Sequence, residues 1–579
     1  MFFHRNSLFA VCFAGLVLTA SVCEAVDPEV LAAQKRRVAV VKKVAPTVVA
    51  IFARGGRGGG SGVLITPDGY ALTNFHVTRG AGTFMKCGLN DGKLYDAVIV
   101  GIDPTGDVAL IKMLGRNDFP HAPLGDSDKV KQGDWAFAMG NPFLLATDFK
   151  PTVTYGIVSG VHRYQYPAGK NLLEYTDCIQ IDTSINPGNS GGPLFNEAGE
   201  LIGINGRGSF EKRGRVNSGA GYAISINQIK HFMGHLRSGR IVDHATLGAT
   251  VATRDDGAVV VTDILEESEA FRRGLELGDE IVSFAGRSIR SVNQYKNILG
   301  IYPKGWKLPL VYRRNNEQKK IYVRLRALHR ASDFQAPKKK LPKGRPAPKR
   351  KAPVAKPPEQ YKHLYIKKDG YANYYFNKLE QARTLKQIKS YGDYSSLNGN
   401  WTLSGKTSTG KPFTIYLTNT QVAMELDQKA SLQALDKEFT DSPSKTGGFL
   451  IAMQSLKVFL IHSQKHDGFP MYYLGTEPLD GRGELVDVIV SEYIGRKTGS
   501  KADGRWYFSS KDGSFRGFDT SLGKDVDECQ IRIAEIREFN GRKFPAKLTI
   551  RHAEKEFATL NIEKITFAKT TNAKTTKTP

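Results

Sequence analysis

The feature that most constrains this chain is a serine surrounded by glycines. Ser190 lies within Asn186-Pro-Gly-Asn-Ser-Gly-Gly-Pro-Leu194. Glycines crowded around one hydroxyl favour a tight turn whose backbone N–H groups converge on a single point. Acyl transfer needs this combination of an exposed nucleophile and nearby donors for the oxyanion. Because serine is a weak nucleophile at its own pKa, a base and an orienting acid are expected elsewhere in the chain.

Candidates for both groups lie upstream of the serine. His76 closes the apolar stretch Tyr70-Ala-Leu-Thr-Asn-Phe-His, and Asp107 directly precedes the strand-like run Val-Ala-Leu-Ile. Taken singly, such a histidine is more often structural, and such an aspartate is usually a turn former. The chain order His, Asp, Ser is nevertheless one of the orders known for a catalytic triad. Together the three residues predict that Ser190 is a catalytic nucleophile and that its loop is not merely a structural Gly-rich turn.

The three motifs resemble the active-site motifs of the HtrA/Deg family of trypsin-like serine proteases. They are Thr73-Asn-Phe-His-Val77, Asp107-Val-Ala-Leu-Ile-Lys112 and Asn186-Pro-Gly-Asn-Ser-Gly-Gly-Pro-Leu194, and the resemblance runs from about residue 35 to about residue 328. It implies an ATP-independent endopeptidase that needs no metal or organic cofactor. It also implies an oxyanion hole lined by the backbone N–H groups of Gly188 and Ser190, with Asn189 between them. Family members form trimers and larger cages, so a trimer-based homo-oligomer is expected.

Neighbours of Ser190 refine the expected specificity. Digestive relatives have an aspartate before the nucleophile that pairs with a freed N-terminus; this chain has Asn189, so activation by propeptide cleavage is not expected. Where Lys/Arg-cleaving relatives have a buried aspartate, this chain has Ser184. A cationic P1 side chain would be desolvated there without a partner, which is costly. We therefore expect small or medium apolar P1 residues, with Ile185 as a wall of the pocket. Arg207, in the basic loop 204–215, would either narrow the pocket or admit an acidic group.

Two further segments carry regulatory expectations. Thr154-Tyr-Gly-Ile-Val-Ser-Gly160 followed by Arg163 resembles the family's regulatory loop; the alternative for Arg163 is a solvent-exposed loop arginine. Residues 246 to 328 resemble a PDZ domain. Such modules bind protein C-termini as an added strand, with backbone N–H groups receiving the carboxylate. The corresponding loop here is formed by Leu247, Gly248 and Ala249.

The chain is too long for one domain, and its composition changes mark the boundaries. The expected fold is multidomain and mainly β: a trypsin-like double β-barrel, a PDZ domain, a Pro/Lys-rich linker and a β-rich α+β C-terminal domain. We expect a helix over residues 29 to 45, a first barrel carrying His76 and Asp107, and a second carrying Ser190. The expected ranges are a signal peptide at 1–25, the protease domain at 29–240, the PDZ domain at 244–329, the linker at 331–360 and the C-terminal domain at 361–570.

The C-terminal region shows no catalytic constellation. A helix-like start at Tyr374 precedes several β-type runs, among them 413–417, 456–461, 485–490 and 530–533. One hairpin, residues 536 to 550, is similar to the open barrels of lipoprotein carriers. His462 and His466 lack matched ligands and are expected at the surface. The region is expected to be a mostly antiparallel sheet that binds substrate, envelope or a lipid-like ligand.

Charge and the N-terminus bear on location and partners. Lys and Arg number 82 against 57 Asp and Glu, a formal charge of +25. This balance permits anionic partners but more often reports solubility, and no specific nucleic acid is expected. The linker is either a plain spacer or a contact to an anionic surface polymer.

The short apolar run 8–18 after His4 and Arg5 predicts a secretory signal, with an uncleaved anchor as the alternative. Export to the periplasm or the extracellular face of a bacterial envelope follows.

Five cysteines are present, of which Cys12 and Cys23 lie in the signal peptide. The others are widely spaced and form neither a disulfide framework nor a metal site. Free, packed thiols are expected, with a Cys87–Cys178 disulfide as the alternative.

The leading hypothesis is an exported serine endopeptidase that degrades misfolded or damaged envelope proteins. The rival is a chaperone or a surface-polymer-binding protein in which proteolysis is incidental.

Overall fold

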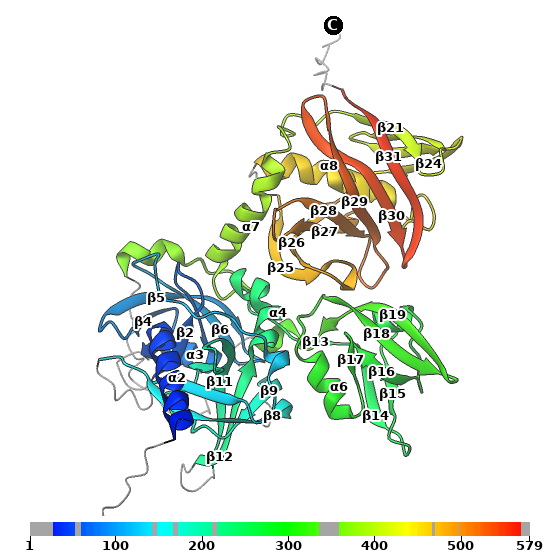
Figure 1. The fold of residues 1–579 in the computed structure, drawn as a ribbon. Coiled ribbons are helices and arrows are strands. Elements are labelled where there is room, and N and C mark those ends of the chain that lie inside the picture. Colours follow the sequence, from blue (N-terminus) through cyan, green and yellow to red (C-terminus); the bar gives the residue numbers. More distant parts are fainter. Residues whose placement is uncertain are drawn as a thin grey trace, which may run out of the picture.

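The computed structural model describes residues 27–52, 59–141, 148–165, 172–210, 217–334, 358–465, 469–495 and 497–568. The predicted signal peptide and most of the predicted linker lie outside these ranges. Figure 1 shows three bodies, with the C-terminal domain above the two others and α7 descending from it toward the N-terminal half. The fold is multidomain and mainly β, as predicted.

The N-terminal half contains two closed six-stranded barrels, preceded by α2 (Pro28–Val44). Asp27 caps α2 through a 2.8 Å hydrogen bond from Glu29 N, and Pro46 lies just beyond the helix end. The first barrel runs in the order β1-β2-β3-β6-β5-β4 and the second in the order β10-β11-β12-β9-β8-β7. The strands are β1 (Val48–Phe52), β2 (Gly59–Leu64), β3 (Tyr70–Asn74), β4 (Phe84–Gly88), β5 (Leu94–Asp103), β6 (Val108–Met113), β7 (Trp135–Gly140), β8 (Thr152–Gln165), β9 (Tyr175–Ile181), β10 (Pro193–Phe195), β11 (Leu201–Phe210) and β12 (Asn217–Ser225).

Two helices complete the barrels. Helix α3 (Phe75–Ala81) follows β3 directly, and α4 (Ile226–Arg237) follows β12. One apolar cluster contains residues from both barrels, including Leu72, Val108, Phe195 and Ile224, and α4 adds Phe232 to it. The two barrels therefore share a core, which fixes the loops at their junction relative to each other.

The next body, here called the 245–327 unit, is a sheet with two short helices. Its strand order is β14-β15-β16-β18-β19, with β17 beside β16, and β13 pairs separately with β20. Ser291 caps α6 by accepting a hydrogen bond from Gln294 N at 3.1 Å. The elements are β13 (Ala245–Thr246), β14 (Ala249–Thr253), β15 (Val259–Ile264), α5 (Glu269–Arg272), β16 (Glu280–Phe284), β17 (Arg287–Ser288), α6 (Val292–Leu299), β18 (Lys307–Arg314), β19 (Glu317–Arg324) and β20 (Arg326–Ala327).

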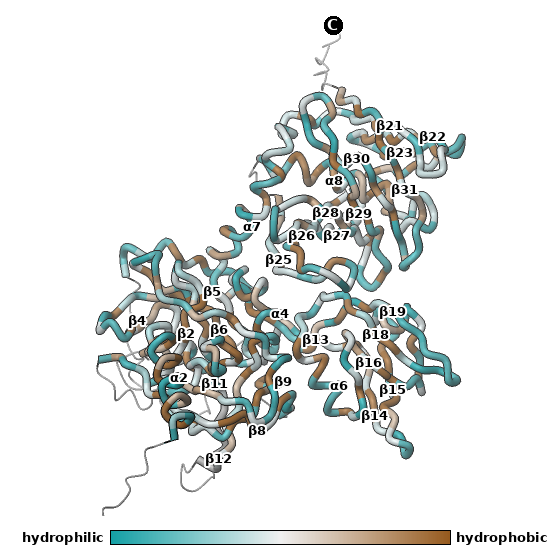
Figure 2. Tube along the Cα trace, in the orientation of Figure 1, coloured by the Kyte–Doolittle hydropathy of each residue, from teal (hydrophilic) through white to brown (hydrophobic). Residues whose placement is uncertain are grey.

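The C-terminal domain is one antiparallel sheet of eleven strands that packs around α8 (Phe449–Lys465). The strand order is β24-β23-β22-β21-β31-β30-β29-β28-β27-β26-β25. Figure 2 shows hydrophobic residues along α8 and hydrophilic ones on the outer loops. The other elements are α7 (Tyr374–Lys389), β21 (Trp401–Thr407), β22 (Pro412–Leu417), β23 (Gln421–Leu426), β24 (Lys429–Ala434), β25 (Met471–Pro478), β26 (Leu485–Ile494), β27 (Lys501–Ser509), β28 (Phe515–Ser521), β29 (Cys529–Phe539), β30 (Arg542–His552) and β31 (Lys555–Phe567).

Two details of this domain differ from expectation. The run 456–461 is helical, within α8, and the prediction of a strand is wrong. A helix surrounded by a curved sheet is buried on most sides, so its apolar residues form a continuous run like that of a buried strand. His462 is half-buried and stacks on Phe469, with ring centroids 4.9 Å apart, rather than lying free at the surface. His466 lies outside the described residues.

Backbones of the three bodies approach closely where they meet. A Cβ at Gly234 of α4 would lie 2.5 Å from Thr476 Oγ1, and one at Gly475 would lie 2.7 Å from His235 Nδ1. Trp306 of the 245–327 unit donates its indole N–H to Thr476 O at 2.7 Å. The second half of β25 thus contacts both other bodies.

Candidate active site

His76 and Asp107 are joined by hydrogen bonds of both side chain and backbone. His76 Nδ1 lies 2.7 Å from Asp107 Oδ2, and His76 N donates to Asp107 Oδ1 at 3.0 Å. The Asp107 carbonyl accepts from Asn74 Nδ2 at 3.0 Å and from Phe75 N at 3.1 Å. Asp107, directly before β6, adopts φ = 57°, a left-handed conformation that few non-glycine residues take. These contacts hold the corner between β3 and α3 against the carboxylate and the carbonyl of Asp107.

A second buried aspartate holds the turn that carries Asp107. Asp103 Oδ1 accepts from Thr105 N at 3.1 Å and from Gly106 N at 2.9 Å, while Oδ2 lies 2.8 Å from His244 Nε2. His244 is fully buried and follows α4. Its burial would lower the pKa of the imidazole, but the charge and hydrogen bond of Asp103 outweigh burial and raise it. The turn is therefore anchored from the connection to the 245–327 unit.

The imidazole of His76 is tuned by its surroundings. Burial acts to lower its pKa, but the hydrogen bond and the negative charge of Asp107 outweigh that effect and raise the pKa above the ordinary value of 6.5. Arg79 opposes this rise by charge repulsion. Because Nδ1 faces Asp107, Nε2 is the nitrogen left to exchange a proton with a substrate or nucleophile.

The loop carrying Ser190 crosses from the second barrel onto the first. Ser61 of β2 donates its hydroxyl to Gly188 O at 2.7 Å and its backbone N–H to Ser190 O at 2.9 Å. Gly191 has φ = 83°, and a Cβ there would lie 2.3 Å from both Ser61 O and Thr73 Oγ1. Only glycine allows this approach. The serine loop therefore lies against the strand that leads to His76.

The hydroxyl of Ser190 donates to Gly206 O at 3.3 Å, and the described residues show no hydrogen bond between Ser190 and His76. Rotation about χ1 would redirect the hydroxyl, and catalytic hydrogen bonds often form fully only with substrate present. Asn189 N donates to Asn186 O at 2.9 Å. Within the described chain the backbone N–H groups of Gly188 and Ser190 have no acceptor. Two donors beside one hydroxyl are thus left available for an oxyanion.

The residues predicted to form the substrate pocket lie in different settings. Ser184 is exposed, and its carbonyl accepts from Thr154 Oγ1 at 3.3 Å and from Asn189 Nδ2 at 3.4 Å. Ile185 is buried, and a Cβ at Gly221 would lie 2.8 Å from Ile185 Cγ1. Arg207 belongs to β11, but its side chain lies outside the described part of the structure.

The predicted regulatory position borders a contact between bodies, but Arg163 does not make that contact. Its guanidinium lies against Gly160, whose missing Cβ would be 2.5 Å from Arg163 Nε. The contact is made by Asp177, a buried carboxylate 2.7 Å from His162 Nδ1 and 2.8 Å from Arg287 Nη1. Asn297 of α6 accepts from Asp177 N at 2.6 Å and donates to His162 O at 3.1 Å. Sequence reasoning missed Asp177, because one acidic residue inside a strand carries no signal.

The loop at 247–249 is tightly ordered. Leu247 is buried, Gly248 has φ = 78°, and Gly248 N donates to Thr246 Oγ1 at 3.2 Å. Tyr295 of α6 donates its hydroxyl to Ala249 O at 2.9 Å. One carbonyl of β14 is therefore already engaged by the helix opposite it.

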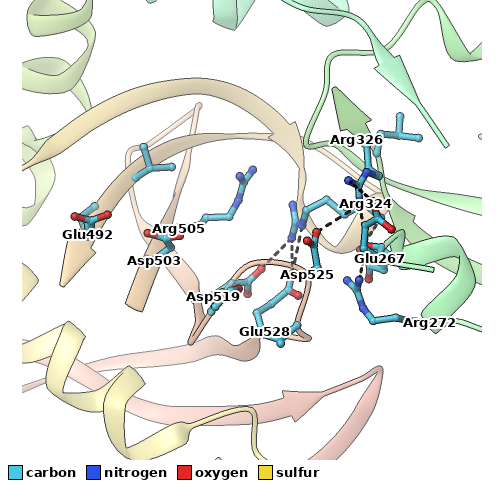
Figure 3. Close-up of a pocket in the computed structure, with 18 of the residues that line it drawn as sticks. Glu267, Arg272, Arg324, Arg326, Glu492, Asp503, Arg505, Asp519, Asp525 and Glu528 are labelled. Carbon is cyan, nitrogen blue, oxygen red and sulfur yellow. Dashed lines mark hydrogen bonds and ion pairs between the residues drawn. The ribbon is translucent and has the colours of Figure 1, made fainter. Parts of the chain in front are cut away.

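A charged cavity of about 560 Å³ separates the 245–327 unit from β26–β28 (Figure 3). Most of its charges are paired within the protein: Arg324 donates to Asp519 at 3.2 Å and to Glu528 at 2.9 Å. Arg326 lies 3.4 Å from Asp525. The cavity therefore forms part of the junction between two bodies, away from Ser190.

The described residues contain three buried cysteines and no candidate metal site or membrane-spanning helix. Cys87, Cys178 and Cys529 are free and buried, so the alternative of a Cys87–Cys178 disulfide is wrong. In the described ranges no cluster of three or more His, Cys, Asp or Glu side chains is arranged to hold a metal ion. No helix among these residues has the length and apolar character needed to cross a bilayer.

Part of the chain is similar in sequence to known proteins. Residues 60–204 match the family described as trypsin-like peptidase domain. The chain is 36% identical over 298 residues to the periplasmic serine endoprotease DegP of Escherichia coli K12, covering 47% of this chain and 60% of that protein. It is 35% identical over 262 residues to a probable periplasmic serine endoprotease, DegP-like, of Chlamydia muridarum, covering 43% and 50%. The chain thus spans about half the length of these relatives. A solved HtrA-type protease, AlgW with tripeptide, aligns at 32% identity and a TM-score of 0.41 over 50% of this chain and 96% of that one.

Proposed function

We propose, from the premise that residues 60–204 are a trypsin-like peptidase domain, that this protein is an exported, ATP-independent serine endopeptidase of the HtrA/Deg type. Its substrates would be misfolded or damaged envelope proteins. The relatives named above are periplasmic by their descriptions, which supports an envelope location. The observation that carries the proposal is the 2.7 Å contact between His76 Nδ1 and Asp107 Oδ2 beside the loop of Ser190.

The proposed mechanism assigns one role to each group. His76 Nε2 takes the proton of the Ser190 hydroxyl as the oxygen attacks the substrate carbonyl, and later gives the proton to the leaving amine. Asp107 holds the imidazole tautomer and stabilises the imidazolium. The backbone N–H groups of Gly188 and Ser190 stabilise the oxyanion.

Labelling with a fluorophosphonate tests the nucleophile directly. The wild-type protein is expected to label and to cleave unfolded casein, whereas Ser190→Ala should not label and should lose several orders of magnitude in rate. The rival function as a chaperone predicts that Ser190→Ala still suppresses aggregation at full strength and that wild-type cleavage is negligible. Casein cleavage near the wild-type rate by Ser190→Ala would reject the triad.

Substrate preference is proposed from the pocket residues. Ser184 and Ile185 supply no carboxylate, so P1 Val, Ala or Leu should be cleaved faster than P1 Lys or Arg. The 245–327 unit is proposed as a PDZ domain that adds a C-terminal peptide to β14, with the 247–249 loop near the carboxylate. Peptide-library profiling checks the first point, and binding of C-terminal peptides checks the second.

Two partner proposals rest on the resemblance and on composition. A trimer-based homo-oligomer is proposed, and analytical ultracentrifugation measures it. The basic Pro-rich linker, residues 331–360, is proposed as a contact to anionic surface polymer, because it carries many Lys and Arg and no apolar period. Loss of polymer binding when these charges are neutralised would support that role.

A further inference from the structure

A tyrosine contacts the proposed catalytic carboxylate from the second barrel. Tyr175, the first residue of β9, donates its hydroxyl to Asp107 Oδ2 at 2.7 Å. Both residues are buried, with 3% and 1% of their surfaces exposed. The sequence motifs around His76, Asp107 and Ser190 include no residue near position 175, so this contact joins distant parts of the chain.

The phenol completes the hydrogen bonding of a carboxylate removed from water. Asp107 Oδ1 accepts from His76 N, and Oδ2 faces His76 Nδ1. Tyr175 adds a donor from the second barrel, on the side away from the His76 corner of the first barrel. A buried anion needs several donors to stay ionised, and donors from two sides fix the plane of the carboxylate as well as its charge.

Gly206 explains why the phenol can reach this position. A Cβ at Gly206 would lie 2.6 Å from Tyr175 Cε1 and 2.9 Å from the Tyr175 hydroxyl oxygen, so any side chain there would displace the ring. Gly206 does not adopt a left-handed φ, so the lack of space for a side chain, and not the backbone conformation, requires glycine here. The carbonyl of the same residue accepts from Ser190 Oγ. Gly206 therefore lies between the nucleophile and the phenol.

We infer that Tyr175 is a positioning residue of the proposed triad: its hydroxyl holds the Asp107 carboxylate, and through it the His76 imidazole, in the orientation for proton transfer. The inference rests on the proposed function, because it assigns Tyr175 a role in that reaction. Tyr175 acts through Asp107 and does not touch substrate.

Replacing Tyr175 by Phe keeps the buried ring and removes only the donor. The carboxylate loses a charge-assisted hydrogen bond and part of its orientation, so kcat should fall about tenfold with KM little changed. The hydroxyl also places a positive dipole end near the imidazole. Its removal favours the imidazolium, so the acid limb of kcat should move to higher pH. Arg79, the other charged group acting on His76, is unaffected by the substitution.

The test compares the full-length wild type, Tyr175→Phe and the control Tyr70→Phe, which removes a buried phenol of β3 from the same domain. Steady-state kinetics over a pH series are joined by an NMR titration of the His76 imidazole, which needs no substrate. Lower kcat, an imidazole that titrates at higher pH in Tyr175→Phe, and a near-wild-type control support the inference.

Three results would overturn it. The first is wild-type kcat and titration in Tyr175→Phe. The second is a lower kcat with an unchanged titration and a lowered melting temperature, since packing alone then explains the loss. The third is an equal loss in Tyr70→Phe. A folded wild type that cleaves no substrate would reject the proposed function instead, and the imidazole titration would still report whether Tyr175 acts on the Asp107–His76 pair.

Discussion

The junction between the 245–327 unit and the C-terminal domain depends on Arg324, and replacing it tests how that junction is held. The Arg324 guanidinium, at the end of β19, lies 3.4 Å from Glu477, 3.2 Å from Asp519 and 2.9 Å from Glu528. Burial would raise the pKa of Glu528, but the charges of Arg324 and Lys307 outweigh it, so the pKa lies below its ordinary value. The Arg324 guanidinium is therefore surrounded by three carboxylates, of which Glu477 and Asp519 are buried and Glu528 is largely buried.

In Arg324→Met the three carboxylates are not affected equally. Glu477 keeps its ion pair with Arg505, and Asp519 keeps a 2.7 Å contact with Arg532. Glu528 loses its closest cation. Removing one partner from a buried ion pair costs about 3–5 kcal/mol, because the remaining charge stays desolvated. For a domain of this size that corresponds to a melting transition lowered by about 10 °C.

Scanning calorimetry of the full chain is the assay, read transition by transition because a multidomain protein does not unfold in one step. The matched control is Arg313→Met, which removes a partly exposed pair with Glu280 and should cost less than about 1 kcal/mol. Because the pKa of Glu528 is depressed in the folded state, its ionised carboxylate contributes to the free energy of unfolding above pH 4.5. That contribution is lost as the pH falls below 4.5 toward the folded-state pKa. The melting temperatures of the two variants should therefore converge at acidic pH. Equal melting of Arg324→Met and Arg313→Met at neutral pH would refute this reasoning.

Three further predictions follow from the site and its contacts. Because His76 must be neutral to act as a base and its pKa is raised, kcat/KM should fall with decreasing pH through a pKa above 6.5; an acid limb centred at or below 6.5 would contradict this. Gly191→Ala should abolish fluorophosphonate labelling, whereas Gly92→Ala, also at positive φ but with open space around it, should label like wild type; equal labelling of both would contradict the steric argument. Arg287→Met should speed amide hydrogen exchange in α6 about tenfold, since Asp177 loses an ion pair, while the exposed Arg290→Met should not; unchanged exchange would show that Asp177 does not fasten α6.

Local motifs predicted the parts of the site that depend on local backbone. The glycines around Ser190 are required by close backbone approach, and Gly191 against Ser61 and Thr73 is the direct example. The strands of both barrels follow from short apolar runs separated by turns, so the double barrel was predictable.

Contacts between distant segments carry no comparable signal in the sequence. Tyr175 and Asp177 look like ordinary residues of a strand, and their partners Asp107 and Arg287 lie 68 and 110 positions away. Arg163, chosen by resemblance, lies beside the contact that His162 and Asp177 make. The strand predicted at 456–461 failed for another reason: burial on most sides of α8 removes the periodicity that distinguishes a helix.

The order of strands in the C-terminal sheet constrains how this domain can be made. β31 comes last along the chain, yet it pairs with β21 on one side and with β30 on the other. A polypeptide stopped before residue 555 would have two half-sheets with facing unpaired edges and no strand to join them. During synthesis α8 therefore stays incompletely covered until β31 has been made, and a truncation just before residue 555 should be as damaging to this domain as a truncation much earlier in the sheet.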